Sequence, residues 1–186
     1  MNILQAIGDP KVFEPWFRRG DWTGWEAFLA SLFAIPFQND EQDTYRACTG
    51  RNEPPAAPSN EAWLICGRRS GKSFILALIA AYLACFRDYR PYLQPGERAT
   101  ILVLASDKRQ ARTIFRYISA LLSEVPMLAK LIQRTTTESI ELSNRVSVEV
   151  SVNNYRSVRG YTLAAALCDE IAFWRSDDSA NPDTEV

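Results

Sequence analysis

Hydrophobic positions along the chain change their spacing several times, and these changes predict alternating helices and strands. Continuous apolar runs at residues 62–66 and 100–105 are typical of strands that are buried on both faces. The apolar segment at residues 74–86 is too short to cross a bilayer, for which about 20 residues are needed, so we expect a helix buried in a protein core. The pattern therefore predicts an α/β protein.

Further elements follow toward the C-terminus. Residues 107–125 place apolar side chains at helical spacing, and Asp107 can cap this helix with its carboxylate. Between residues 139 and 152 the spacing changes to two on both sides of a turn near residues 143–145, which predicts a β-hairpin with one buried face. Residues 163–168 are alanine-rich, and we interpret them as a strand because an Asp-Glu pair follows them.

The N-terminal third of the chain predicts short helices joined by polar connections. Residues 23–26 (TGWE) have the form of a capping box, and apolar side chains follow at helical spacing as far as Pro36. A second short helical stretch precedes residues 52–60, whose prolines and polar residues predict an exposed connection. We therefore assign residues 1–60 to an N-terminal helical segment and residues 61–186 to a core domain.

Composition limits the classes of protein to which the chain can belong. With 47% hydrophobic and 23% charged residues, the composition is that of a globular protein, so disorder of the whole chain is excluded. Four widely spaced cysteines and the lack of histidine leave no zinc framework or CxxC redox pair. We expect reduced thiols, as in a cytosolic protein, and no signal peptide, because the N-terminus lacks a basic region followed by an apolar core.

The charge distribution allows nucleic-acid binding only through a local cationic patch. A formal net charge of −1 gives the whole chain no attraction to DNA, so any contact requires a local patch. Arg109, Arg112 and Arg116 line up on the polar side of the helix predicted after Asp107. This stripe can follow a phosphate backbone, or it can be a solvated helix face.

The sequence GRRSGKS at residues 67–73 lies between the apolar run at 62–66 and the apolar helix, an order typical of a phosphate-binding loop. We expect the loop to bind ATP, with Lys72 on the β and γ phosphates and the Ser73 hydroxyl on Mg²⁺. Cys66 stands where the consensus has its first glycine, and a strand-turn-helix with solvated cations is the alternative. The residues assigned to ATP binding are Gly67, Arg69, Ser70, Gly71, Lys72 and Ser73.

The Asp-Glu pair after residues 163–168 predicts the other half of an ATPase site. Asp169 can hold the magnesium shell, and Glu170 can orient and deprotonate an attacking water. A solvated loop pair is the alternative. Upstream of the loop, the amide of Gln38 or Gln42 can read the adenine edge, and spacing does not choose between them.

The segments GRRSGKS and SVRGYTLAAALCDEIAFW, with the strand and hairpin layout between them, resemble the N-terminal ATPase domain of the large terminase subunit, the motor that packages DNA into tailed-phage capsids. The resemblance covers about residues 22–183. It implies a P-loop NTPase of the additional-strand catalytic-glutamate class, with a mainly parallel central sheet flanked by helices and an added β-hairpin. Glu170 would be the catalytic base, and Arg68 matches an arginine of the family's loop. Arg159 would be a finger for a neighbouring subunit's site, or a structural salt-bridge partner.

The resemblance also implies a function and partners. ATP hydrolysis with Mg²⁺ would drive double-stranded DNA into a procapsid, in the cytoplasm of a bacterial host. The portal protein and the small terminase subunit would be partners, and a homo-oligomeric ring is expected, with no membrane contact. A further core strand and a nuclease domain follow in the family, whereas this chain stops at Val186. We therefore expect the last core strands and the nuclease domain to be absent, and the chain alone to hydrolyse ATP poorly or not at all.

Two other functions remain open from the sequence. A helicase-like nucleic-acid-dependent ATPase shares the early motifs, but DEAD-box helicases usually carry Asp or His two residues after the glutamate, where this chain has Ala172. A nucleotide-binding module without turnover is the other. Binding without turnover would distinguish it from a working motor.

Overall fold

The computed structural model describes residues 1–38, 41–152 and 160–174, and it divides the chain into two compact units, Met1–Ser70 and Gly71–Val186. No helix among the described residues combines the length and the hydrophobicity that a membrane crossing requires.

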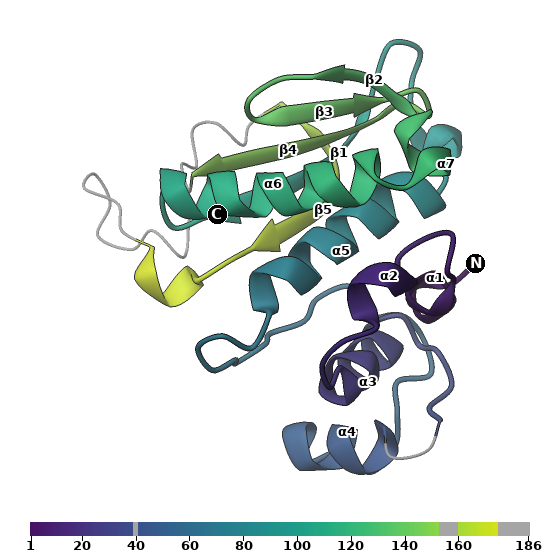
Figure 1. Ribbon diagram of the computed structural model, residues 1–186, viewed down its shortest axis with the longest axis vertical. Coiled ribbons are helices and arrows are strands. Elements are labelled where there is room, and N and C mark those ends of the chain that lie inside the picture. The colour runs from purple at the N-terminus through teal and green to yellow at the C-terminus, as the bar shows by residue number, and fades with distance from the viewer. Residues whose placement is uncertain (39–40, 153–159, 175–186) are drawn as a thin grey trace. The chain divides into compact units, whose positions relative to one another are not determined.

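The N-terminal unit is helical. Its helices are α1 (Ile3–Gly8), α2 (Glu14–Phe17), α3 (Thr23–Leu32) and α4 (Glu41–Thr49), coloured purple to blue in Figure 1. Helix α1 contacts α2 and α3, and α3 contacts α4, around the fully buried side chains of Ile3, Phe13 and Leu29. The two helical stretches predicted on either side of Pro36 are confirmed as α3 and α4, and residues 52–60 are mostly exposed, as predicted.

The start of α3 differs from the prediction. The helix begins at Thr23 itself, with Trp22 at the N-cap position and no side-chain cap hydrogen bond, so the predicted capping box is wrong. Asp21 explains the difference, because its Oδ1 accepts a hydrogen bond from the Thr23 backbone N–H at 3.0 Å and thereby satisfies the first turn from outside the helix. Hydrogen bonding from the Thr23 side chain, and to a smaller extent from this backbone N–H, lowers the pKa of Asp21.

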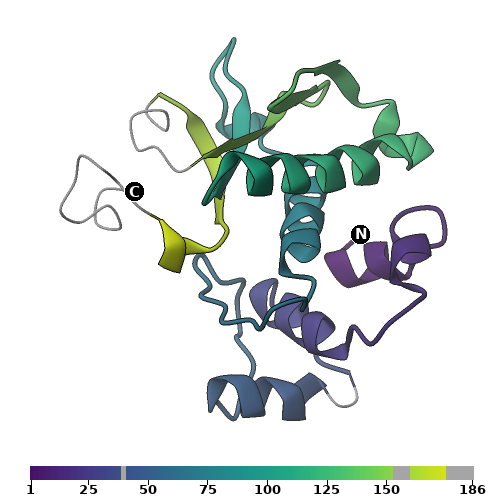
Figure 2. The same cartoon turned by 60° about the vertical axis from the view of Figure 1, so that its left-hand side comes forward.

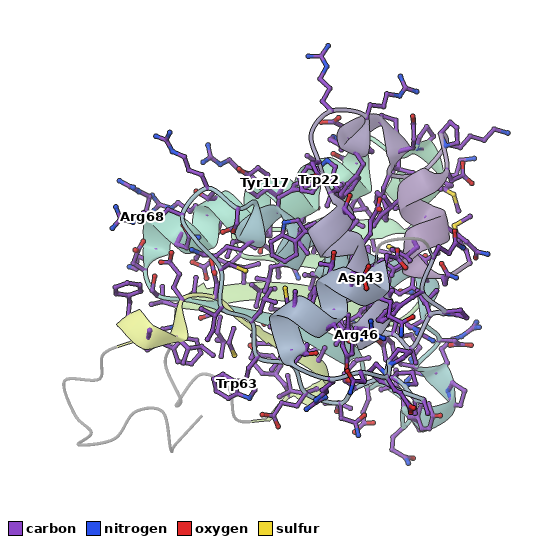
Figure 3. All side chains as sticks on the ribbon, turned by 90° about the horizontal axis from the view of Figure 1, so that it is seen from below. Trp22, Asp43, Arg46, Trp63, Arg68 and Tyr117 are labelled. Carbon is purple, nitrogen blue, oxygen red and sulfur yellow. The ribbon has the colours of Figure 1, made fainter. Side chains whose placement is uncertain are left out.

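The strand predicted at residues 62–66 is also not observed. Residues 61–67 adopt no helix or strand, the Trp63 side chain is 75% exposed and Ile65 is fully exposed (Figure 3). An apolar run becomes a strand only when its backbone N–H and C=O groups pair with a neighbouring strand. The strand was predicted from hydrophobicity alone, and hydrophobicity does not show whether a neighbouring strand is present.

The C-terminal unit combines helices with a sheet. Its elements are α5 (Lys72–Phe86), the 3-10 turn η1 (Arg90–Tyr92), β1 (Ala99–Ala105), α6 (Lys108–Ser123), α7 (Pro126–Ala129), β2 (Ile132–Thr135), β3 (Ser139–Leu142), β4 (Val146–Val152), β5 (Thr162–Cys168) and the 3-10 turn η3 (Ile171–Phe173).

These strands form one mixed sheet in the order β2-β3-β4-β1-β5 (Figure 1). Strand β1 pairs in parallel with both β4 and β5, whereas β3 pairs antiparallel with both β2 and β4. The predicted strands at β1 and β5 and the predicted hairpin of β3 and β4 are confirmed. Because β4 is also a neighbour of β1, the hairpin is part of the central sheet rather than an addition to its edge.

Helices α5 and α6 pack against each other and both contact β1 and β4 (Figures 1 and 2). Every residue of β1 is buried, as its continuous apolar sequence predicted. The apolar stripe of α6 faces this core, with Ile114, Ile118 and Leu122 fully buried. The α/β expectation is therefore confirmed for residues 71–152 and 160–174, at the level of a mixed sheet flanked by helices.

Candidate active site

The first component of the site is the start of α5. Gly71 is the N-cap residue and has φ of 87°, a left-handed conformation that a side chain would strain. Lys72 and Ser73 are therefore the first two helical residues, at the end where the helix dipole is positive. The sequence folds this way because Gly71 permits the sharp turn and most of the apolar residues from Ile75 to Ala84 are buried.

The second component is the end of β5. The Asp169 backbone N–H donates to the Leu104 carbonyl at 2.8 Å, so Asp169 is held against β1, and its side chain is only 4% exposed. The next residue, Glu170, has φ of 55°, an uncommon value for a residue with a side chain. Such conformations concentrate at functional sites, where the surrounding structure maintains them.

The two components meet. The Ser73 hydroxyl donates to Asp169 Oδ2 at 3.2 Å, and Lys72 Nζ lies 3.0 Å from Glu170 Oε1. Four residues that the sequence singled out, two at the start of α5 and two at the end of β5, are thus in direct contact. The structure brings together Lys72, Ser73, Asp169 and Glu170.

Three further side chains support this cluster, and the sequence analysis missed them as site residues. The Gln110 amide, in the first turn of α6, donates from Nε2 to Asp169 Oδ2 at 2.7 Å and to Ser73 Oγ at 2.9 Å. Ser106 Oγ donates to Glu170 Oε2 at 3.3 Å, and Trp174 Nε1 donates to the Asp169 carbonyl at 3.0 Å.

A topological signal for Ser106 and Gln110 was present in the sequence. Both residues follow the carboxyl end of β1, and the carboxyl ends of parallel strands lie at one edge of a sheet, where ligands bind in α/β proteins. The predicted cap at Asp107 is confirmed, since its carboxylate accepts from the backbone N–H groups of Arg109 and Gln110. That cap places Gln110 in the first turn of α6. Trp174 had no comparable signal.

The residues present fit a magnesium ion bound together with a phosphate chain. Mg²⁺ favours oxygen ligands and is usually held by one or two protein groups plus substrate phosphates. Asp169 and Ser73 supply a carboxylate and a hydroxyl oxygen at one point, and Lys72 supplies a positive charge beside them. Among the described residues there is no group of three or more Cys, Asp or Glu side chains that could hold a metal by themselves.

The loop residues before Gly71 belong to the N-terminal unit. Gly67, Arg68 and Arg69 are exposed, and Figure 3 shows the Arg68 side chain at the outside of the ribbon. Arg69 has φ of 61°, so the loop turns sharply at a residue with a side chain. The Ser70 carbonyl accepts from Trp25 Nε1 at 2.8 Å, whereas the Ser70 hydroxyl oxygen is buried without a hydrogen-bond partner among the described residues.

The remaining predicted residues have other surroundings. Gln38 is exposed, and its backbone N–H donates to Glu41 Oε2 at 2.7 Å. The Gln42 side chain donates to the Asn52 carbonyl at 3.3 Å, so its amide already has a partner within the N-terminal unit. Arg159, the predicted finger, lies outside the described residues.

The fold and the site define a class of protein: a mixed α/β domain in which a lysine and a serine at the start of one helix meet an Asp-Glu pair at the end of a parallel strand. Residues 64–181 match the family described as terminase large subunit, T4likevirus-type, N-terminal. The chain therefore belongs to the large terminase subunit family. A comparison with curated proteins finds no match.

Family membership confirms the resemblance seen in the sequence and supports a DNA-packaging terminase role. It also favours this role over the helicase alternative. Large terminase subunits are generally ATPases, and DNA is their substrate in packaging.

Proposed function

We propose that this chain binds Mg-ATP between the start of α5 and the end of β5 and that the hydrolysis of ATP drives double-stranded DNA into a phage procapsid. The contact of Ser73 with Asp169, across 96 residues of sequence, is the observation that carries the proposal. It supports the proposal because a residue at the start of α5 contacts a residue at the end of β5. The P-loop NTPase fold of the catalytic-glutamate class is part of this proposal.

Each residue has a distinct task in the proposed reaction. Lys72 binds the β and γ phosphates, and Ser73 and Asp169 hold the magnesium ion. A magnesium ion held by these two residues would supply positive charge that neutralises the phosphate oxygens. Glu170 accepts a proton from the attacking water, and the Ser106 hydrogen bond keeps one oxygen of the carboxylate oriented. Arg68 and Arg159 remain proposed sources of positive charge for the transition state.

The same proposal includes partners that the family implies. A trans-acting Arg159 would require a homo-oligomeric ring of subunits, and the portal protein and the small terminase subunit would complete the motor in the host cytoplasm. Either Gln38 or Gln42 would contact adenine. For Gln42 this requires its amide to leave the Asn52 carbonyl, which accepts its hydrogen bond now.

Magnesium-dependent ATP binding by the full chain tests the proposal. Asp169→Asn removes the charge that attracts Mg²⁺ while it keeps the size of the side chain, so we expect ATP to bind weakly at every magnesium concentration. Asp88→Asn is the matched control, because Asp88 is exposed and is bonded to Arg90 on a separate turn. Equal magnesium dependence in the two variants would contradict the assignment of Asp169.

A further inference from the structure

The exposed face of α6 carries a concentration of positive charge that the rest of the chain lacks. Four cations lie in the first nine residues of the helix, and the whole of α6 contains no carboxylate. The net charge of the entire chain is −1, so this helix is a strong local departure from the average. Lys108, Arg109, Arg112 and Arg116 are all exposed.

Three of these cations form one surface, which we call the arginine face. Arg109, Arg112 and Arg116 are spaced i, i+3 and i+7, so they share one side of the helix and span about 10 Å along its axis. They line a shallow hollow of about 320 Å³ with Phe115 as the fourth residue. Figure 3 labels Tyr117, the residue that follows Arg116, on the same helix.

The guanidinium groups of the arginine face are available to a partner. No carboxylate among the described residues forms an ion pair with Arg109, Arg112 or Arg116. By contrast, exposed Arg18, Arg90 and Arg134 each lie within 4 Å of a carboxylate oxygen. The three arginines of this face therefore have no carboxylate within 4 Å among the described residues, and Arg116 Nη2 donates one hydrogen bond to Thr113 Oγ1 at 3.3 Å.

We propose that the arginine face is a docking surface for double-stranded DNA and that its guanidinium groups contact backbone phosphates. Three cations spread over about 10 Å match a polyanion rather than a single phosphate group. A duplex presents its phosphates outward, where an exposed helix face can reach them, while its bases stay stacked inside. The choice of DNA as the polyanion rests on the proposed function.

The single aromatic ring in the hollow favours duplex over single-stranded DNA. Single strands are usually bound by aromatic side chains on which successive bases stack. Among the residues that the structure describes, Phe115 is the one aromatic residue that lines this hollow, and it is half-buried, so it offers little surface for stacking. Such a surface reads phosphate spacing rather than base sequence, as a motor that moves along any duplex requires.

The position of the arginine face also relates it to the proposed ATP site. Arg109 precedes Gln110, whose amide donates to both Ser73 and Asp169. A phosphate backbone at Arg109 and a nucleotide at Ser73 would therefore lie beside two neighbouring residues of α6, Arg109 and Gln110.

Salt-dependent DNA binding by the full chain tests the proposal. Fluorescence anisotropy of a labelled duplex of mixed sequence would be measured between 50 and 200 mM salt. The test variant carries Arg109→Gln, Arg112→Gln and Arg116→Gln. The control variant carries Arg18→Gln, Arg90→Gln and Arg134→Gln, which changes the net charge by the same amount at exposed arginines that have carboxylate partners.

We expect the plot of log affinity against log salt to be shallower by about 2.7 in the test variant, because each lost phosphate contact removes about 0.9 from the slope. The wild-type chain would then lose about 40-fold more affinity than the test variant over this salt range. The control variant should keep the wild-type slope, and replacing the same three α6 arginines by lysine should largely restore it.

Other outcomes overturn the proposal. Equal slopes in the test and control variants would show that the arginine face is not the contact, and tighter binding of a single strand than of the duplex would assign a different nucleic acid to it. Absence of salt-dependent binding by the wild-type chain would also overturn it. ATP binding measured on the same test variant separates this result from the proposed function, because a variant that loses DNA and still binds ATP leaves the nucleotide site intact.

Discussion

The Lys72 ammonium and the Glu170 carboxylate, from the start of α5 and the end of β5, form an ion pair in which Nζ and Oε1 are 3.0 Å apart. Both side chains are about one-third exposed, so the pair is worth only about 0.5–1 kcal/mol after solvent screening. A triphosphate carries several negative charges and competes for the same ammonium group. In the proposed function, ATP binding therefore takes Lys72 away from Glu170 and leaves this carboxylate free to accept a proton.

Lys72→Ala should weaken ATP binding by about 10- to 100-fold, because a hydrogen bond to a charged group contributes about 1.5–3 kcal/mol. Isothermal titration calorimetry with Mg-ATP on the full chain measures this. Lys130→Ala is the control, since Lys130 is exposed and lies at the end of α7, and it should bind ATP like the wild type. Unchanged affinity in Lys72→Ala would remove Lys72 from the site.

Glu170→Gln should change ATP binding in the opposite direction. Loss of the carboxylate releases Lys72 from its ion pair, so affinity should rise by about 2- to 5-fold, the equivalent of 0.5–1 kcal/mol. Any hydrolysis by the wild-type chain should fall by about 10²- to 10⁴-fold in the variant, as expected when a general base is removed. Glu124→Gln, at an exposed position after α6, should change neither quantity. Weaker ATP binding by Glu170→Gln would contradict the competition for Lys72.

Gln110→Ala should lower the magnesium concentration that half-saturates ATP binding. The Gln110 amide donates at 2.7 Å to the same Asp169 oxygen to which Ser73 also donates, so it competes with a cation for that oxygen. Without Mg²⁺ the variant should lose about 1.5–3 kcal/mol of unfolding free energy, because the buried Asp169 carboxylate loses a donor. Magnesium titrations and urea unfolding measure the two effects. Gln94→Ala, an exposed glutamine, should show neither.

Burial raises the pKa of the Cys85 thiol from 9.0 to about 12, which predicts a stability change at high pH. Above pH 9 the thiol ionises in the unfolded chain but stays protonated in the folded one, so the unfolding free energy should fall as pH rises toward 12. The slope from this group is at most about 1.4 kcal/mol per pH unit. Urea unfolding of the wild type and of Cys85→Ala at pH 8 and pH 10.5 isolates this contribution.

Cys48→Ala is the control for this measurement, because Cys48 is exposed. It should lose the same stability between the two pH values as the wild type does, whereas Cys85→Ala should lose less. Equal losses in Cys85→Ala and the wild type would show that the Cys85 thiol ionises alike in the folded and unfolded chain.

Elements with a strong local signal were predictable from the sequence. Strand β1 is continuously apolar and is buried along its whole length. Helix α6 has the Asp107 cap at its start, and its apolar side chains stay on one side of the helix as far as its C-terminal end. The cluster of Lys72 and Glu170 was predictable for a different reason. The carboxyl end of β5 lies at the edge of the sheet at which α5 begins. The two motifs, one at the start of α5 and one after β5, are therefore close in space although they are far apart in the sequence.

Elements that depend on a neighbour were not predictable in the same way. Residues 62–66 have the hydrophobicity of a strand, but a strand also needs a partner for its backbone, and the structure gives them none among the described strands. Gln110 looked like an ordinary polar residue of α6, because its role arises from contact with Ser73 and Asp169, which lie far from it in the sequence. Trp174 likewise acquires its partner, the Asp169 carbonyl, only through the turn at η3.

A crystal structure of the full chain with Mg²⁺ and a non-hydrolysable ATP analogue tests the central claim most directly. We predict the metal at about 2.1 Å from the Ser73 hydroxyl, beside the Asp169 carboxylate, with Lys72 moved from Glu170 onto the phosphates. A phosphate chain bound elsewhere, or bound while Lys72 keeps its ion pair with Glu170, would contradict the account.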